Sequence, residues 1–323
     1  MRIAVTGSIA TDHLMTFPGR FVDQLMPDKL HKVSLSFLAD SLSIRNGGVA
    51  ANMAFGMGCL GLRPLLIGTA GADFAGYRDW LEQHGVDTGG VRESQLHHTG
   101  RYVATTDLDM NQIASFYPGA MTEDREIDLA GVTGGAGGVD LILIGASDPE
   151  AMLSFTRQCR ELGIAFASDT SWQLARMDGP QVRELVDGAA YLFSNEYEAT
   201  LIEHKTGWSA AEVADRVGVR VTTLGADGAR VERAGQPPVA VPSVAVVPQE
   251  PTGAGDAFRA GFLSAVAWGL SLERAAQLGN LIAAHALETI GNQEYELKPG
   301  PLAERFEAAY GSEAGQEIAA HYN

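Results

Sequence analysis

The segment EPTGAGDAFRAGF spans residues 250–262 and joins a glycine-rich turn to the start of a helix. Gly253 and Gly255 let backbone N–H groups approach a ligand closely, and a helix N-terminus offers unpaired N–H donors with partial positive charge. Asp256 lies where this helix is expected to begin. An anion site beside a carboxylate that accepts a proton is the minimum equipment for moving a phosphoryl group onto an alcohol. The alternative is that Asp256 only caps a core helix, and this segment alone leaves both open.

Strand-like and helical patterns alternate along most of the remaining chain. Asp148 and Pro149 predict the start of one helix, and Gly163 predicts its end. Continuous apolar strands separated by amphipathic helices predict an α/β fold, in which a mostly parallel central sheet is covered on both faces. We expect one domain over residues 1–323. The expected strands are 2–6, 65–67, 141–145, 164–167, 191–193 and 219–224.

Two segments interrupt this alternation of strands and helices. Residues 33–44 and 101–117 alternate apolar and polar side chains, and the second segment is expected to form a hairpin that turns at 107–111. Alternation implies one solvated face, so these strands should form a small β layer attached to the body. Such a layer can act as a lid that excludes water from a reacting centre. The alternative is a set of surface hairpins without a role. The expected lid segments are about 13–17, 33–45 and 100–118.

Composition narrows the classes of function. Of the 323 residues, 46% are hydrophobic and 20% are charged, which is typical of a globular protein with a buried core. The formal net charge of −17 argues against a nucleic-acid partner, because binding to polyphosphates depends on Lys and Arg. Cys59 and Cys159 are too few for a disulfide framework and are interpreted as small buried hydrophobic residues. The chain begins directly in an expected strand, and no apolar run approaches the ~20 residues of a membrane span, so we expect a cytoplasmic protein without a membrane partner.

Residues 46–52 read NGGVAAN and form a second glycine turn that opens an alanine-rich helix. Gly48 and Asn52 are four residues apart and therefore share one helical face. An Asn amide both donates and accepts hydrogen bonds, which suits a vicinal diol. Asp12 follows the first strand, at the edge where open α/β sheets bind ligands. Taken singly, Asp12 is better explained as a turn residue and the two glycines as a close-packing device.

Two further motifs lie in the second half of the chain. Asn195 can cap a helix and face phosphates, while Glu198, one turn later, can hold magnesium; the alternative is a capping interaction alone. Residues 222–228 end a strand in a glycine turn that could accept a nucleotide, or that simply leads into a hairpin with 229–232. The sequence has no GxxxxGK[ST] phosphate loop, no GxGxxG after the first strand and no HExxH. P-loop, dinucleotide-binding and zinc-peptidase chemistry are therefore not expected.

The order and spacing of these motifs resemble the ribokinase-like (PfkB) carbohydrate kinases. That family has a glycine pair before a helix, a central NxxE motif and a C-terminal GAGD motif, which match Gly47-Gly48, Asn195 to Glu198 and Gly253 to Asp256. Within the family the chain is most similar to actinobacterial adenosine kinases, through VTGSIATDHLM, HKVSLSFLAD, QIASFYPGAM, SDTSWQLAR and GDAFRAGFL. The resemblance implies a three-layer α/β/α body with a small β-sheet lid, and ATP-dependent phosphorylation of the 5′-hydroxyl of adenosine.

The resemblance also implies a role for each matching residue. Asp256 would accept the hydroxyl proton, while the amides of Gly253, Ala254 and Gly255 would stabilise the transferring phosphoryl group. Glu198 would organise Mg²⁺. ATP would contact Asn195, Thr223, Gly225, Asp227, Gly228 and Gly255. The nucleoside would contact Ser8, Asp12, Ser36, Gly48, Asn52, Tyr102, Phe116, Trp172 and Gln173.

Two departures from the family pattern leave questions open. Glu250 stands where the family usually has Asp, at a position that belongs to a monovalent-cation site in several relatives, so dependence on K⁺ stays open. Trp172 stands where close relatives carry Gln, so strict preference for adenosine stays open. The alternatives are a kinase for another nucleoside or for a sugar such as ribose, and a catalytically silent ligand sensor. The resemblance further implies a homodimer formed through the lid, with Phe37 reaching the partner's site.

Overall fold

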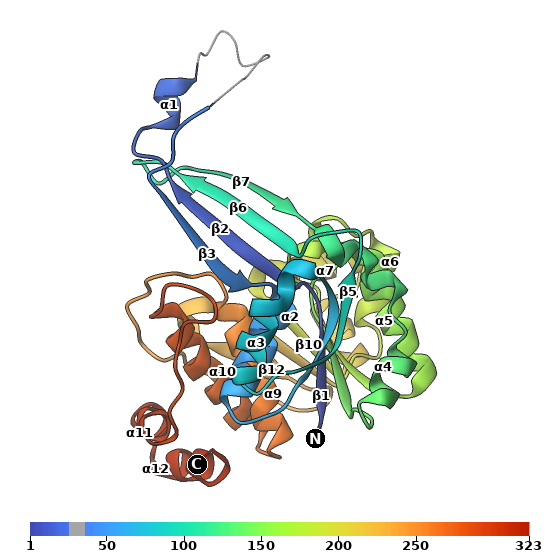
Figure 1. Ribbon diagram of the computed structural model, residues 1–323. Helices are drawn as coiled ribbons and strands as arrows, with labels where there is room; N and C mark the ends of the chain where they lie inside the picture. The colour runs from blue at the N-terminus through green and yellow to red at the C-terminus, as the bar shows by residue number, and fades with distance from the viewer. Residues whose placement is uncertain (26–35, 323) are drawn as a thin grey trace.

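A nine-stranded sheet runs through the middle of the part of the chain that the structure describes (Figure 1). The structure is a computed structural model and describes residues 1–25 and 36–322. The strand order is β13-β12-β11-β10-β9-β8-β1-β4-β5, and all neighbours from β11 to β5 are parallel. β12 and β13 add an antiparallel edge. The strands are β1 (Ile3–Thr6), β4 (Leu65–Gly71), β5 (Asp87–Ser94), β8 (Leu141–Ile144), β9 (Ala165–Asp169), β10 (Tyr191–Asn195), β11 (Val219–Thr223), β12 (Ala229–Glu232) and β13 (Val239–Val241).

Helices cover both faces of this sheet, so the predicted three-layer α/β/α body is confirmed (Figure 1). Successive side chains of a buried strand enter different cores: Val5 packs on one side and Ala4 on the other. The first core includes α2 (Val49–Cys59), α3 (Ala75–Gln83), α9 (Ala254–Ala267), α10 (Leu272–Leu287), α11 (Pro299–Tyr310) and α12 (Ser312–His321). The second core includes α4 (Leu129–Gly135), α5 (Pro149–Leu162), α6 (Gly179–Val186), α7 (Glu196–Thr206) and α8 (Ala210–Arg216).

The six strands expected in the body are present, with ends shifted by a few residues; β5 and β13 were not predicted. The expected helix start at Asp148 is also confirmed, because its side chain accepts the N–H groups of Glu150 and Ala151 and Pro149 occupies the first turn. Gly163 ends that helix with a left-handed φ of 65°. Among the described residues, no helix has both the length and the apolar character that crossing a bilayer requires.

A separate four-stranded sheet, in the order β3-β2-β6-β7, extends away from the body beyond the end of β1 (Figure 1). Its strands are β2 (Ala10–Thr16), β3 (Ser41–Gly47), β6 (Gly100–Thr106) and β7 (Gln112–Tyr117), and the short helix α1 (Phe21–Gln24) lies near its tip. The hairpin predicted for residues 101–117 is confirmed as β6 and β7. Because β2 starts four residues after β1 ends, this sheet stands over the carboxyl ends of the central strands.

The strand predicted at 33–44 is wrong in position. Residues 36–39 have no regular secondary structure, and 33–35 lie outside the described residues. The strand is instead β3, which spans Ser41–Gly47 and pairs with β2 along its whole length. This pairing determines where the strand starts and ends, whereas the alternation of polarity does not. Phe37 is therefore not on a strand. It is half-buried against Phe17 and Phe21, at ring-centroid distances of 4.9 and 5.3 Å.

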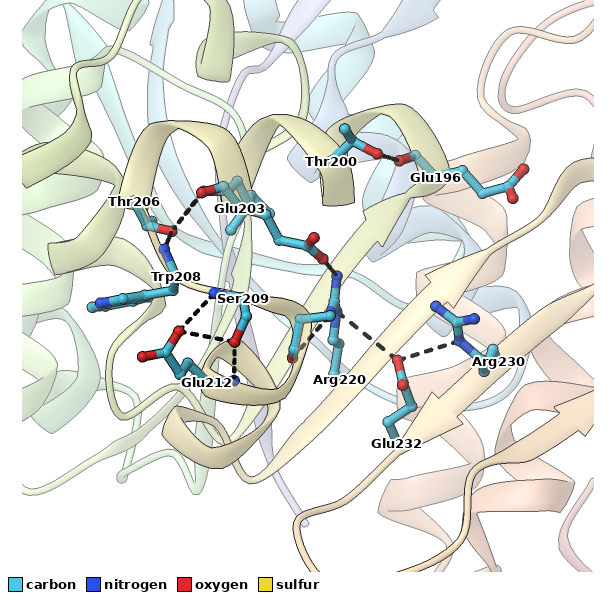
Figure 2. Close-up of polar contacts among 12 residues, drawn as sticks. Glu196, Thr200, Glu203, Thr206, Trp208, Ser209, Glu212, Arg220, Arg230 and Glu232 are labelled. Carbon is cyan, nitrogen blue, oxygen red and sulfur yellow. Dashed lines mark hydrogen bonds and ion pairs between the residues drawn. The ribbon is translucent and has the colours of Figure 1, made fainter.

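A buried arginine joins the central sheet to the helices behind it, as Figure 2 shows. The Arg220 side chain on β11 is 2% exposed, and its Nη2 lies 2.7 Å from Oε1 of Glu203 on α7. Glu232, the cross-strand neighbour on β12, lies 4.0 Å away and also pairs with the more exposed Arg230 at 3.3 Å. Removing one member of a buried ion pair leaves an uncompensated charge, which costs more than losing a surface pair.

We therefore expect Glu203→Gln to lower the free energy of unfolding by about 1–3 kcal/mol, since the introduced amide still accepts a hydrogen bond but carries no charge. Arg230→Gln is the matched control at the surface end of the same network, with an expected change below ~1 kcal/mol. Urea unfolding followed by circular dichroism measures both variants. Equal effects would show that Arg220 does not depend on Glu203.

Candidate active site

A cavity of about 480 Å³, here called the first cavity, lies between the small sheet and the body. It opens at the carboxyl end of β1, which is the edge of the sheet where the sequence predicted ligand binding. The lining residues come from β2, β6, β7, the start of α2, the segments after β1 and β9, the segment leading into α9 with its first turn, and the segment after α10. They are Ser8, Ala10, Asp12, Leu14, Gly48, Val49, Asn52, Tyr102, Thr106, Gln112, Phe116, Trp172, Glu250, Thr252, Asp256 and Asn292.

Gly48 places the start of α2 against the end of β1. Its φ is +96°, and a Cβ here would lie 2.6 Å from the Ser8 carbonyl oxygen and the Ala10 nitrogen, so only glycine fits. The Ser8 Oγ accepts the Val49 N–H at 2.9 Å. Asn52, one turn into the helix, therefore faces the cavity. Gly48 therefore does allow close packing, as the alternative interpretation held, and this packing also positions the Asn52 side chain.

Asp12 and Glu250 carry negative charge at one wall of the first cavity. Burial and, to a smaller extent, the Glu250 carboxylate raise the pKa of Asp12 against the opposing charge of Arg45, and the result is a pKa of about 6. Asn292 Nδ2 lies 3.4 Å from Oδ2 of Asp12. Glu250 accepts the Gly291 N–H at 2.9 Å and lies 3.6 Å from Nη1 of Arg45. This wall therefore offers carboxylate acceptors and an amide donor, a set that suits hydroxyl groups.

Aromatic rings line a further part of the first cavity. Tyr102 and Phe116 are direct cross-strand partners on β6 and β7. Phe116 meets Trp172 edge to face, with ring centroids 6.0 Å apart and an interplanar angle of 67°. Ser171, immediately before Trp172, has a φ of +45°, which is strained for a residue with a side chain. Phe116 and Trp172 are 39% and 43% exposed, so this wall can accept a flat apolar group.

Asp256 stands at the inner end of the first cavity, in the first turn of α9. Gly253 is the N-cap residue and the helix begins at Ala254. No side chain caps its N-terminus, so Asp256 is not a cap as the alternative interpretation held. Burial raises the pKa of Asp256 to about 7, although the hydrogen bond from Asn52 Nδ2 at 2.9 Å lowers it. A carboxylate that titrates near neutral pH is suited to accept a proton during a reaction.

The orientation of the Asn52 amide is fixed by a buried chain of hydrogen bonds. Gln293 Nε2 donates to Asn52 Oδ1 at 2.9 Å and to the Tyr77 hydroxyl oxygen at 2.5 Å. The Tyr77 hydroxyl in turn donates to the Gly47 carbonyl at 2.8 Å. Because Asn52 Oδ1 accepts from Gln293, its Nδ2 must point to Asp256. Neither Tyr77 and Gln293 nor this series of hydrogen bonds was predicted from the sequence.

A second cavity, of about 340 Å³, lies on the other side of Asp256. Its lining includes the uncapped N-terminus of α9, which favours an anion. Asn195 and Glu198 form a reciprocal capping box at the start of α7, each accepting the other's backbone N–H at 2.8 Å, so the capping interpretation is correct and both residues also line the cavity. The lining residues are Val49, Asp169, Ser171, Asn195, Glu198, Thr223, Gly253, Gly255, Asp256 and Arg259.

Several residues expected at the site do not line either cavity. Ser36 is exposed, and Gln173 is buried and donates to the Ser147 carbonyl oxygen. Gly225, Asp227 and Gly228 form the turn of the β11–β12 hairpin, which is the alternative considered for residues 222–228, while Thr223 lines the second cavity. Ala254 opens α9 behind the glycines.

Other cavity residues were missed by sequence reasoning, because none of them is at an interpreted position of a motif and each becomes part of the site only through the fold. Asp169 ends β9 and would have been found from its place at the carboxyl end of a predicted strand. Arg259 lies inside the quoted segment 250–262, where a charge on an otherwise apolar helix face was the available signal. The missed lining residues are Ala10, Leu14, Val49, Thr106, Gln112, Asp169, Ser171, Thr252, Arg259 and Asn292.

Comparisons with known proteins place this geometry in a family. Residues 7–298 match the model of the pfkB family carbohydrate kinases. A nucleoside kinase of Methanothermobacter thermautotrophicus is 31% identical over 277 residues, which are 83% of this chain and 86% of that relative. A nucleoside kinase of Burkholderia thailandensis, solved in complex with inosine, has a TM-score of 0.84 at 33% identity and covers 96% of this chain and 99% of its own. Its structure in complex with ADP-inosine has a TM-score of 0.81 at 34% identity, covering 96% of each chain.

The raised pKa of Asp256 predicts a pH-dependent stability. The folded protein holds the proton more tightly than the unfolded chain, so the contribution of Asp256 to stability falls as pH rises from about 4 to about 7. Asp256→Asn removes this cost, and its melting temperature should rise relative to the unmodified protein across that window. Thermal unfolding at several pH values measures the difference, with Asp215→Asn on the exposed face of α8 as the control. A difference that does not change with pH would contradict the raised pKa.

Proposed function

The chain belongs to the pfkB family of carbohydrate kinases, and we propose that it transfers a phosphoryl group from ATP to the 5′-hydroxyl of adenosine, giving AMP and ADP. The observation that carries this proposal is the position of Asp256, which lines both cavities. One cavity has a hydroxyl-binding wall and an aromatic wall, and the other has a helix N-terminus suited to phosphate. A group that moves from the second to the first must pass Asp256.

Different residues of the first cavity would bind different parts of the nucleoside that accepts the phosphoryl group. Asp12 and Asn52 would hydrogen-bond the ribose hydroxyls, and the base would lie against Phe116 and Trp172. This places the 5′-hydroxyl beside Asp256, whose carboxylate would accept its proton as the new O–P bond forms. The backbone N–H groups of residues 253–255 would stabilise the charge on the transferring phosphoryl group.

The second cavity would hold the phosphates of ATP, with Asn195 and Thr223 beside them. Within residues 1–25 and 36–322, no cluster of three or more His, Cys, Asp or Glu side chains is arranged to hold a metal. A metal at this site would therefore be bound mainly by substrate phosphates and water, with few ligands from the protein, as is usual for Mg²⁺. Glu198 is the carboxylate placed to contact it, directly or through water. When bound, Mg²⁺ would neutralise charge on the phosphates.

Two observations favour a nucleoside over a free sugar. A pentose has no base for the aromatic wall to contact, and the Burkholderia thailandensis relative has been solved with inosine. Adenosine is proposed within this class from the similarity of the quoted segments to adenosine kinases. Trp172 can reshape the base site, so the choice among purine nucleosides needs a direct comparison.

We expect the protein to convert adenosine and ATP to equal amounts of AMP and ADP when Mg²⁺ is present. Ribose should be a much poorer acceptor because it lacks a base, and 2′-deoxyadenosine should have a lower kcat/KM because a missing hydroxyl leaves buried polar groups unpaired. Asp256→Asn should lower turnover by at least ~10²-fold while nucleoside binding, measured by calorimetry, changes far less.

Each other outcome selects an alternative. Faster phosphorylation of ribose than of any nucleoside would make the protein a sugar kinase. Binding of adenosine without formation of AMP would make it a ligand sensor. Comparable turnover of folded Asp256→Asn would overturn the role of Asp256 as the base.

We also propose a homodimer formed through the small sheet. The pairing register puts Asp12, Tyr102 and Phe116 on the face toward the first cavity, and therefore puts Leu42 and Ile44 on the opposite face. These two side chains are 57% and 59% exposed. A second copy of the sheet would cover them, and symmetric pairing of identical surfaces is the commonest way to do so.

Sedimentation velocity at micromolar concentration should therefore find a dimer. The double variant Leu42→Glu with Ile44→Glu should sediment as a folded monomer. Val247→Glu, which changes another exposed apolar residue outside the sheet, should leave the dimer intact. A monomeric unmodified protein would contradict the proposal.

A further inference from the structure

We propose that Arg259 is a positioning residue, whose buried ion pair with Asp169 holds the anion-binding turn and sets the charge balance around Asp256. This inference rests on the proposed function for its role in turnover. The geometry on which it is built, and one of its tests, do not depend on activity.

The pair is nearly closed to solvent and has two contacts. Arg259 Nε lies 2.7 Å from Asp169 Oδ2, and Arg259 Nη2 donates to Asp169 Oδ1 at 2.8 Å. The two side chains are 7% and 1% exposed. The hydrogen bond from Nη2 and the short ion-pair contact of Nε together hold the guanidinium group against the Asp169 carboxylate. The guanidinium carbon of Arg259 also lies 5.7 Å from the centre of the Phe193 ring, within the range of a cation–π contact.

The third contact joins this pair to the anion-binding turn. Arg259 Nη1 donates to the Gly255 carbonyl oxygen at 2.9 Å. Gly255 is the residue before Asp256, and Asp169 is the last residue of β9. Arg259 therefore connects the carboxyl end of a central strand to the first turn of α9. The orientation of the amides at 253–255 and of the Asp256 side chain is tied to the sheet through these contacts.

Stability does not explain why the chain has this pair. Arg259 lies in the second turn of α9, and its guanidinium reaches back to Gly255 in the first turn, where a positive charge opposes the helix dipole. A buried ion pair is often no more stable than apolar residues of the same volume. Asp169 and Arg259 also line the second cavity beside Asn195 and Glu198. A cation beside a helix N-terminus adds to the attraction for phosphate, which gives the pair a function at this place in the fold.

The two members of the pair act on Asp256 in opposite directions. The positive charge of Arg259 lowers the pKa of Asp256, and the negative charge of Asp169 raises it. Asp12 on β2 raises it further, and the Asn52 amide on α2 lowers it through its hydrogen bond. Tyr77 and Tyr295 are neutral neighbours because burial raises the pKa of both hydroxyls, and Glu198 on α7 acts on Asp169 and Arg259.

This opposition gives a test that a purely structural role would not pass. Arg259→Met should move the acidic limb of the pH profile of kcat/KM to higher pH, whereas Asp169→Asn should move it to lower pH. Arg259→Lys keeps the charge and loses the two-point contact, so its profile should stay near that of the unmodified protein. All three variants should lower kcat, by about 10- to 100-fold, with little change in the KM for nucleoside, because the first cavity is intact.

A second measurement does not require activity. The melting temperature of each variant is compared, over a range of pH, with that of the same variant carrying Asp256→Asn as a second substitution. The pH at which the difference between the two melting temperatures changes reports the titration of Asp256. Arg259→Met should raise this pH and Asp169→Asn should lower it. Arg259→Gln, which also removes the charge, serves where Arg259→Met does not fold. Shifts in the same direction, or no shift, would overturn the inference, whereas absence of phosphoryl transfer in the unmodified protein alongside opposite shifts would overturn only the proposed function.

Discussion

The hydrogen bond from Asn52 to the half-buried Asp256 carboxylate is the interaction on which the site depends. Removing water from a carboxylate raises its pKa, and here the pKa reaches about 7 because one amide donor offsets only part of that cost. The amide is held in the required orientation by Gln293, which lies far along the chain from Asn52. The fold therefore keeps a carboxylate that ionises near neutral pH, which is the property that the proposed role in accepting a proton requires. The same carboxylate divides the cavity that suits a nucleoside from the cavity that suits phosphates.

The two sheets supply different parts of this arrangement. The central sheet places the ends of β9, β10 and β11 in a row, so that Asp169, Asn195 and Thr223 line one cavity with the start of α9. The small sheet supplies the rings of Tyr102 and Phe116 and the carboxylate of Asp12 to the other cavity. Arg45 on β3 contacts Glu250 just before the anion-binding turn, so the small sheet is also connected to the loop that leads into α9. Movement of the small sheet would therefore change both cavities.

Local patterns in the sequence predicted much of the fold and the centre of the site. The glycine turns at Gly48 and Gly253 and the helix start at Asp148 depend on neighbouring residues alone, and the structure has all three. Residues 36–39 were predicted as strand because polarity alternation continues past the point where pairing with β2 ends. The pair formed by Asp169 and Arg259, 90 residues apart, could not be predicted because only the tertiary fold brings the end of β9 to the side chain on α9. Ser36 and Gln173 were assigned by family resemblance, and neither side chain lines a cavity here.

The central claim is that the acceptor hydroxyl and the phosphate donor meet at Asp256. A crystal structure of the protein with adenosine and a non-hydrolysable ATP analogue tests this most directly. The account predicts the 5′-oxygen about 2.6–3.2 Å from the Asp256 carboxylate, which is hydrogen-bond reach for a general base. It also predicts the ribose hydroxyls at Asp12 and Asn52, and the terminal phosphate at the amides of residues 253–255. A nucleoside bound with its base at Asp256, or phosphates bound away from the start of α9, would contradict it.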